Sequence, residues 1–369
     1  MKSATHALAL ILLAASAAPV SAQAGSYSFQ NLGIIGATNA LDINNANAIL
    51  GYVRTAQGIE TPALFSGAST LDLGIIGLDY VRALNNNGAV AGSSYYQGTN
   101  YAAVWTGSSL VRLTNPGGSF NQAVASDISD NGLVVGTVSN HGSNATATVW
   151  VGSPIILARI PGTTNEAVAV NNNGQIAGSI NYPGSGGSRA TLWTGSSVID
   201  LGTLGGTSST AQSINDAGIV VGYSNLLGDA AVSAAVWENG VGQSLGLLPS
   251  GRSSYALDIN EAGAVVGYTT VSGNTPTLRA TLWQASVAFD LNTYLLASVQ
   301  DDGWILTVAS GINDEGSVVG MAYNTISATY SPFLLVAAAV PEPSTSLSVL
   351  IGLGVLASIR HGRRAHSRS

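Results

Sequence analysis

An acidic pair in the C-terminal third of the chain, Asp301 and Asp302, could carry acid–base chemistry. Two carboxyl groups on either side of a glycosidic bond perform most glycoside hydrolysis, so a polysaccharide is the substrate that such a pair would serve. The pair lies with Trp304 in an unusually long segment between Leu291 and Asn313. Inserted segments often carry function, although a solvated acidic loop is the simpler interpretation.

Three tyrosines, Tyr95, Tyr96 and Tyr101, lie close together in the sequence before Trp105. A tyrosine ring combines an apolar face with a polar hydroxyl, which suits contact with a sugar ring. We therefore take these tyrosines as candidate ligand contacts, together with the acidic pair and its neighbouring tryptophan. The alternative interpretation of the tyrosines is ordinary packing or exposed decoration.

The composition excludes several common mechanisms. The chain has no Cys, its only Lys is Lys2, and residues 25–340 contain a single His, His141. Thiolate chemistry, Schiff bases and P-loops need Cys or Lys, which this region lacks. A Ser-His-Asp triad would depend on His141, which lies in a polar loop, and a zinc site usually needs several His or Cys residues. A turn such as Asn215-Asp216-Ala217-Gly218 offers one carboxylate, so it is better interpreted as a structural turn than as a calcium loop. We expect no catalytic constellation, no metal and no cofactor.

The charge balance also restricts the partners. Residues 25–340 hold 7 Arg against 18 acidic residues, which gives this region a net charge of −11. A surface of this sign repels nucleic acid phosphates and anionic lipid. We therefore expect no nucleic acid partner.

The first 24 residues have the pattern of a secretory signal peptide. Lys2 precedes an apolar run over residues 7–18, and small residues follow, with a cleavage site after Ala22 or Ala24. A charged start, a short apolar core and a small-x-small site are typical of such peptides. The sequence thus predicts an exported protein.

Residues 339–369 combine three features in order. Pro341-Glu342-Pro343 is followed by an apolar stretch over residues 344–359 and then by an Arg-rich end. This segment resembles the PEP-CTERM sorting signal of Gram-negative bacteria. The resemblance implies transient inner-membrane association through 344–359, recognition by an exosortase-type processing protease, and delivery to the cell surface or extracellular matrix. The alternative is an ordinary C-terminal anchor, for which the stretch is short.

Between the ends, the chain repeats itself seven times. Four landmarks recur in a fixed order in each repeat: a Leu, an Asn, a Gly within an apolar run, and a large apolar residue. The Asn landmarks are Asn44, Asn85, Ser129, Asn171, Asn215, Asn260 and Asn313. The Gly landmarks are Gly51, Gly92, Gly136, Gly178, Gly222, Gly267 and Gly320. The large apolar landmarks are Phe65, Trp105, Trp150, Trp193, Trp237, Trp283 and Leu335.

Each landmark has a physical meaning. An Asn followed three residues later by Gly, as in Asn215 and Gly218, is typical of a type I turn between two short strands. A Gly inside a strand, such as Gly222, indicates a bulge or a close backbone approach. The recurrent Trp residues occupy equivalent positions, so we expect them in the core rather than on ligand platforms.

Four short strands per repeat of about 45 residues predict an all-β, seven-bladed β-propeller of four-stranded antiparallel blades over residues 25–338. The longest recurrent connection, between the Leu and the Asn, marks the blade boundary. The last blade then lacks its fourth strand, and we expect the N-terminal strand near 27–32 to pair into it and close the ring. Helix is expected only in the signal peptide and the C-terminal segment.

The repeats are similar to the HAF family of extracellular repeats. Asp200-Leu201-Gly202-Thr203-Leu204-Gly205-Gly206, Ile214-Asn215, Val221-Gly222 and Val236-Trp237 carry the resemblance, which covers residues 27–336. The third repeat departs from the pattern at Arg112-Leu113-Thr114, and the His of the family's His-Ala-Phe is missing throughout. The resemblance implies a propeller fold and an extracellular location, and it implies no activity.

We therefore expect an exported, non-catalytic module that binds extracellular polysaccharide or a surface protein. One alternative is a carbohydrate-active enzyme that uses Asp301 and Asp302. A further alternative is a structural component of the cell surface.

Overall fold

A computed structural model of the chain describes residues 27–117, 120–140, 143–184, 186–273 and 277–337. The predicted signal peptide, the sorting motif Pro341-Glu342-Pro343, the apolar stretch 344–359 and His141 lie outside the described residues. Within the described part, no helix is long and apolar enough to cross a membrane.

The strands fall into successive groups of four, which we number as units 1 to 7 in chain order. Unit 1 contains β2 (Ala37–Ile43), β3 (Ile49–Arg54), β4 (Glu60–Ser66) and β5 (Ser69–Asp72). Unit 2 contains β6 (Tyr80–Leu84), β7 (Val90–Tyr96), β8 (Thr99–Trp105) and β9 (Leu110–Arg112). Unit 3 contains β10 (Gln122–Ile128), β11 (Val134–Asn140), β12 (Ser143–Val151) and β13 (Ser153–Ile156).

The remaining units follow the same order. Unit 4 contains β14 (Thr164–Val170), β15 (Ile176–Asn181), β16 (Ser188–Thr194) and β17 (Ser197–Asp200). Unit 5 contains β18 (Gly205–Ile214), β19 (Val220–Leu226), β20 (Val232–Glu238) and β21 (Val241–Ser244). Unit 6 contains β22 (Gly251–Ile259), β23 (Val265–Val271), β24 (Leu278–Gln284) and β25 (Val287–Asp290). Unit 7 contains β26 (Trp304–Ile312), β27 (Val318–Asn324), β28 (Thr329–Ala337) and β1 (Tyr27–Asn31).

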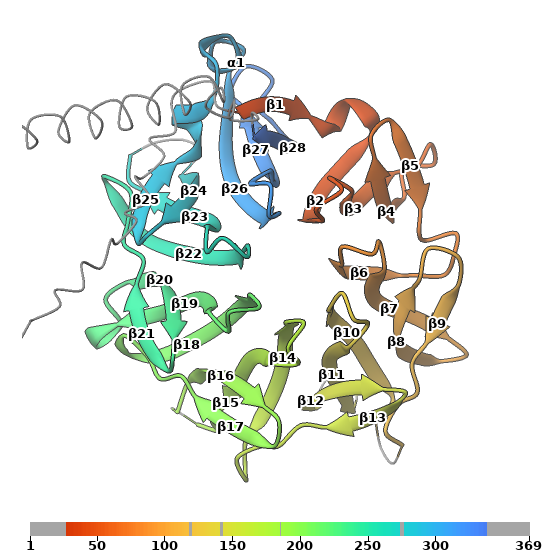
Figure 1. Ribbon diagram of the computed structural model, residues 1–369. Coiled ribbons are helices and arrows are strands. Elements are labelled where there is room, and N and C mark those ends of the chain that lie inside the picture. The colour runs from red at the N-terminus through yellow and green to blue at the C-terminus, as the bar shows by residue number, and fades with distance from the viewer. Residues whose placement is uncertain (1–26, 118–119, 141–142, 185, 274–276, 338–369) are drawn as a thin grey trace, which may run out of the picture.

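Within each unit, neighbouring strands pair antiparallel, and a single parallel bridge between Gln122 and Asn100 joins units 2 and 3. Unit 7 draws its fourth strand from the other end of the chain: β1 pairs antiparallel with β28, with Tyr27 opposite Ala337 and Asn31 opposite Phe333. This is the pairing that the repeat boundaries predict. Figure 1 shows the units arranged around a ring, with the first strand of each unit innermost.

The expectation that helix is confined to the two ends is wrong. The connection between β25 and β26 contains the short helix α1 (Ala297–Asp301) and the 3₁₀ helix η3 (Leu291–Tyr294). Two further 3₁₀ turns, η1 (Leu32–Ile35) and η2 (Leu227–Asp229), lie in other connections. The long connection folds back so that its apolar side chains reach the core. Helical turns satisfy its backbone amides locally, as in the bond from the Val299 amide to the Leu296 carbonyl.

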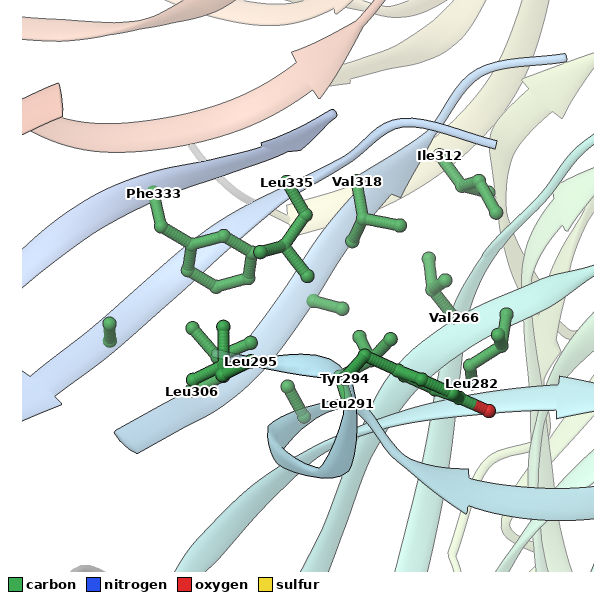
Figure 2. Close-up of a cluster of buried hydrophobic side chains, with 13 residues drawn as sticks. Val266, Leu282, Leu291, Tyr294, Leu295, Leu306, Ile312, Val318, Phe333 and Leu335 are labelled. Atoms are coloured by element: carbon green, nitrogen blue, oxygen red, sulfur yellow. The ribbon is translucent and has the colours of Figure 1, made fainter. Parts of the chain in front are cut away.

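The core lies between neighbouring units. Figure 2 shows the cluster between units 6 and 7, where Phe333, Leu335 and Leu306 meet Leu291 and Leu295 from the long connection. The recurrent aromatic residues are buried in every unit that has one, which confirms that they belong to the core. Burial of such large side chains removes much apolar surface from water and supplies the main driving force for stacking the units.

The recurrent Gly of each second strand has a steric cause. A Cβ built on Gly222 would lie 2.0 Å from the carbonyl oxygen of Thr210 in the neighbouring strand, and the other six copies are similarly obstructed. Real Cβ atoms do not approach a carbonyl oxygen so closely. The register also shifts between Ala211 and Ser213, directly opposite this Gly. The predicted bulge with a close backbone approach is therefore confirmed.

The recurrent Asn holds both its own turn and the next unit. The Asn85 side-chain oxygen accepts from the amides of Asn87 and Ala89, at 3.1 and 2.8 Å. Its side-chain nitrogen donates to the Ser129 carbonyl of unit 3, at 2.9 Å. The same cross-unit bond recurs in six of the seven units: from Asn44 to Asn85, Asn85 to Ser129, Asn171 to Asn215, Asn215 to Asn260, Asn260 to Asn313, and Asn313 to Asn44.

A second circle of hydrogen bonds runs through the residue after each landmark. The backbone amide of Asn45 donates to the Asn86 side chain, and the Asn86 amide donates to Asp130. The bonds continue around all seven units through Asn172, Asp216, Glu261 and Asp314, until the Asp314 amide donates to the Asn45 side chain. Neighbouring units are thus joined by polar contacts at one rim as well as by apolar packing.

We predict that Asn85→Ala lowers the free energy of unfolding by about 2–4 kcal/mol, because two turn amides and one buried carbonyl lose their hydrogen-bond partner. Asn85→Ser is the matched comparison, since Ser129 fills the equivalent position and its hydroxyl accepts from the Leu133 amide. The serine variant should lose about half as much. Urea unfolding measures both. Equal losses in the two variants would show that the turn amides do not need a side-chain acceptor.

Candidate functional site

The antiparallel order of strands gives the ring two chemically different faces. The Asn turns, such as 44–48, and the short turns between third and fourth strands, such as 67–68, must lie on one side, which we call the turn face. The connections between second and third strands, such as 55–59, and those between units, such as 73–79, lie on the other side, which we call the loop face.

A central channel is the first candidate site. Its cavity of about 510 Å³ is lined mainly by the first strands and includes Asp42, Asp127 and Asp258. Each of these aspartates stands two residues before an Asn landmark, or before Ser129 in its place. These aspartates were not predicted as site residues, because Ala83, Ala169, Ser213 and Gly311 take that place in the other units and no repeat pattern appears.

The three aspartates brace neighbouring units rather than stand free in the channel. Asp42 accepts from its neighbour Ile43 and from the Leu84 amide of unit 2, both at 2.7 Å. Asp127 accepts from the Val170 amide of unit 4 at 2.7 Å, and Asp258 accepts from the Ile312 amide of unit 7 at 2.9 Å. The carboxyl oxygens therefore satisfy backbone amides of the next inner strand.

Burial controls the charge of these groups. Burial raises the pKa of Asp42 to about 8, and the nearby Asp258 adds to the effect. Burial likewise raises the pKa of Asp127 to about 7, and it raises the pKa of Asp258. Loss of water around a carboxylate disfavours the charged form, and like charges reinforce this. Among the described residues, no group of three or more acidic or imidazole side chains is placed to hold a metal ion.

A pocket on the loop face is the second candidate site. It has a volume of about 750 Å³, and three tyrosines line it: Tyr52 from unit 1, and Tyr80 and Tyr95 from unit 2. Its polar lining is contributed by Glu60, Asp79, Asn100, Asn121 and Gln122. Tyr80 and Tyr95 are 63% and 64% exposed, so their rings are accessible to a ligand. We call this site the tyrosine pocket.

The backbone around the tyrosine pocket is fixed by hydrogen bonds. The Asp79 carboxylate accepts from the Tyr95 amide, and the Asp79 amide donates to the Ser93 carbonyl at 2.9 Å. The Asn100 amide donates to the Asn121 carbonyl of the next unit at 3.4 Å. The pocket is therefore built by strand ends that are tied together across units 2 and 3, and Asp79 positions Tyr95.

The structure separates the three tyrosines that the sequence groups. Tyr95 lines the pocket, whereas Tyr96 points to the opposite face of the same strand, because successive side chains alternate. The Arg112 guanidinium lies 4.6 Å from the centre of the Tyr96 ring and donates to Ser94. Tyr101 is half-buried and stands opposite Ser94 on that second face. Tyr52 and Tyr80 complete the pocket instead, and neither was a candidate from sequence.

The acidic pair and Trp304 are also separated. Asp301 ends α1, and Asp302 follows it with its carbonyl accepting from the Asn324 side chain. Both aspartates are exposed, and neither lines the pockets beside Trp304. Trp304 is half-buried at the start of β26, with its ring 5.6 Å from that of Phe29. It lines two further pockets on the loop face.

Comparison with protein families decides the question of export. Residues 339–364 match the PEP-CTERM protein-sorting motif. The chain carries a PEP-CTERM sorting signal. The expectation drawn from Pro341-Glu342-Pro343 is therefore confirmed, and the signal indicates export to the cell surface and sorting by an exosortase-type system. No curated protein resembles the chain closely enough to match it.

Several solved structures resemble the fold at a distance. Pyrococcus horikoshii acylaminoacyl peptidase is 10% identical with a TM-score of 0.49, over 77% of this chain and 49% of that one. A Mycobacterium tuberculosis puromycin-hydrolyzing peptidase is 10% identical with a TM-score of 0.49, over 84% and 56%. TolB from Acinetobacter baumannii is 12% identical with a TM-score of 0.42, over 78% of each chain. The alignments thus span about half the length of the two peptidases, and their activities do not transfer to this chain.

The channel aspartates predict that stability falls as the pH rises from about 4 to about 8. The folded protein keeps the proton on Asp127 up to about pH 7 and on Asp42 up to about pH 8, while the unfolded chain releases both near pH 4. Each such group lowers the free energy of unfolding by up to about 1.4 kcal/mol per pH unit. Thermal unfolding at pH 5 and pH 8 measures the slope.

Asp42→Ala is the informative variant, because Ala83 and Ala169 occupy the same place in units 2 and 4. The variant removes one acceptor and should lower the Tm at pH 5. It should also flatten the decline between pH 5 and pH 8. An unchanged decline would mean that Asp42 does not titrate in that range.

Proposed function

We propose that this protein is an exported seven-bladed β-propeller of HAF-type repeats that binds neutral extracellular polysaccharide without cleaving it, through the tyrosine pocket. The single observation that carries the proposal is the convergence of Tyr52, Tyr80 and Tyr95 on one open pocket with carboxylate and amide side chains. Aromatic faces that pack on a ligand, with a few polar groups that fix its orientation, are the usual components of a small-ligand site.

The propeller interpretation is supported by the contacts between the ends of the chain. Unit 7 incorporates β1, and the side chains of Asn313 and Asn45 continue the two hydrogen-bond circles into unit 1. A linear array would expose the apolar faces of its two terminal units, and ring closure buries both. Each four-stranded unit is then one blade.

The position of the sorting signal favours the loop face as the binding face. Tyr27 and Ala337 are paired at the turn face, where the described chain begins and ends. The sorting motif starts at residue 339, only two residues beyond β28. A short connection of this kind holds the turn face towards the inner membrane while residues 344–359 are inserted there. The loop face, with its pockets, then points away from the membrane.

The charge of the tyrosine pocket favours a neutral sugar. Glu60 and Asp79 line it, and none of the described residues that line it is a Lys, Arg or His. A uronic acid or a sulfated sugar would bring a negative charge next to these carboxylates, which costs binding energy. Hydroxyl groups of a neutral sugar can donate to the carboxylates and to the amide oxygen of Asn100 or Gln122.

The test is co-sedimentation of the exported protein with exopolysaccharide from its own producer, with reducing ends assayed in the same tubes. We expect binding without new reducing ends. Tyr95→Ala should weaken it at least tenfold, equivalent to about 1.4 kcal/mol. Tyr96→Ala is the matched control: it removes an adjacent ring that does not line the pocket, and it should bind like the unaltered protein.

Three results would contradict the proposal. New reducing ends that Asp302→Ala abolishes would indicate a carbohydrate-active enzyme. Equal weakening by the two tyrosine variants would place the contact elsewhere on the surface. No sedimentation at all would make polysaccharide the wrong partner, and a surface protein or a structural role would take its place.

A further inference from the structure

We propose that the tyrosine pocket is one end of an extended site on the loop face, which takes several consecutive sugars of a linear neutral glycan rather than one terminal sugar. The inference rests on the proposed function and goes beyond it, because it specifies the length of ligand that the site recognises. Three neighbouring pockets across units 6, 7, 1, 2 and 3 carry it.

The three pockets adjoin one another through shared lining residues. Glu60 lines the tyrosine pocket and also a pocket of about 650 Å³ between units 7 and 1. Trp304 lines that second pocket and also a third of about 360 Å³ between units 6 and 7. A ligand that fills one pocket is therefore in contact with a side chain of the next.

Accessible aromatic rings recur along this path. Tyr80 and Tyr95 stand at one end, Tyr330 lines the second pocket and is 62% exposed, and Trp304 joins the second pocket to the third. Tyr330 and Trp304 each lie against a second aromatic ring. The Tyr323 ring lies 5.0 Å from that of Tyr330, and the Phe29 ring lies 5.6 Å from that of Trp304. Rings that are already held in place lose little conformational entropy when a ligand stacks on them.

The charges along the path balance. The tyrosine pocket contributes Glu60 and Asp79, the second pocket adds Arg54, and the third adds Arg279. Arg54 stands directly opposite Glu60 in the pairing of β3 with β4. Two acidic and two basic side chains give the path no net charge. It therefore suits a neutral glycan along its whole length, whereas a polyanion would meet Glu60 and Asp79 at one end.

The consequence is a dependence of affinity on chain length. Once one sugar is held in the tyrosine pocket, its neighbours are presented to the second and third pockets at high effective concentration. Each additional contact then strengthens binding without the cost of a separate encounter. A single sugar can use only one of the three pockets.

The test uses size fractions from mild acid hydrolysis of the neutral exopolysaccharide of the producer, from one sugar to about ten. Titration calorimetry with the exported protein should show affinity rising at least tenfold across the series before it levels off. Tyr330→Ala should remove most of this rise and leave the shortest binding fraction unaffected. Tyr330→Phe, which keeps the ring, should retain the rise. Thermal unfolding of each variant shows whether it is folded.

Each outcome separates the extended site from the proposed function. Equal affinity for short and long fractions, with Tyr95→Ala still weakening both, would overturn the extended site and keep the sugar-binding function. A length dependence that Tyr330→Ala does not change would also overturn it, because the additional contacts would lie outside the second pocket. No binding of any fraction or of the intact polysaccharide would overturn both proposals.

Discussion

The side-chain amide of the recurrent Asn donates across the unit boundary in six of the seven units, and this bond connects each of those turns to the next unit. Asn215 is a buried side chain whose oxygen accepts from the Ile219 amide of its own turn, while its nitrogen reaches the Asn260 carbonyl of the next unit. One neutral residue thereby closes a turn and links two units. A charged residue at the same place would carry a desolvation cost that an amide avoids. This is consistent with a chain in which only 8% of residues are charged.

Unit 3 lacks the cross-unit bond of the landmark residue, because Ser129 replaces Asn there. Ser129 cannot reach the next unit, and its hydroxyl instead donates to the Asn131 side chain. The Asn131 nitrogen donates to the Asn172 carbonyl of unit 4 at 2.8 Å, and Asp127 accepts from the Val170 amide of the same unit. The link between units 3 and 4 is therefore carried by residues on either side of the missing Asn. Asn87 and Asn173 make the bond equivalent to that of Asn131 in units 2 and 4, so this bond accompanies the landmark bond there and is the one that remains in unit 3.

The sequence predicts the elements that recur and misses those that do not. The turn at Asn215 and the close approach at Gly222 leave a trace in every repeat, because every unit must solve the same steric and hydrogen-bonding problem. The pairing of β1 with β28 follows from the same count, since one unit is a strand short. The helix α1 occurs once, in a connection with no counterpart, so the repeat contains no information about it.

The candidate site was only partly predictable, for the same reason. Tyr95 belongs to the tyrosine pocket, but its partner Tyr52 is contributed by another unit, and no spacing in the sequence connects them. Strand alternation alone could have separated Tyr95 from the adjacent Tyr96. The channel carboxylates were not predicted because an Asp occupies the position of Asp42 in only two other units, at Asp127 and Asp258. These carboxylates accept hydrogen bonds from backbone amides of the next unit, and such a contact leaves no pattern in the sequence.

The division between the two faces favours the loop face for the proposed binding site. On the turn face, a residue such as Asp216 is fixed by its neighbours on both sides, because it accepts from the Asn172 amide and its own amide donates to Glu261. A change there disturbs two units at once. Among the residues that the structure describes, the loop-face connections carry no such circle of bonds, and their lengths differ, from two residues at 97–98 to thirteen at 291–303. The long connection leads directly into Trp304, between two of the three pockets. The two continuous circles of hydrogen bonds thus lie on the turn face, and the connections of the loop face differ enough between units to form pockets of different shape.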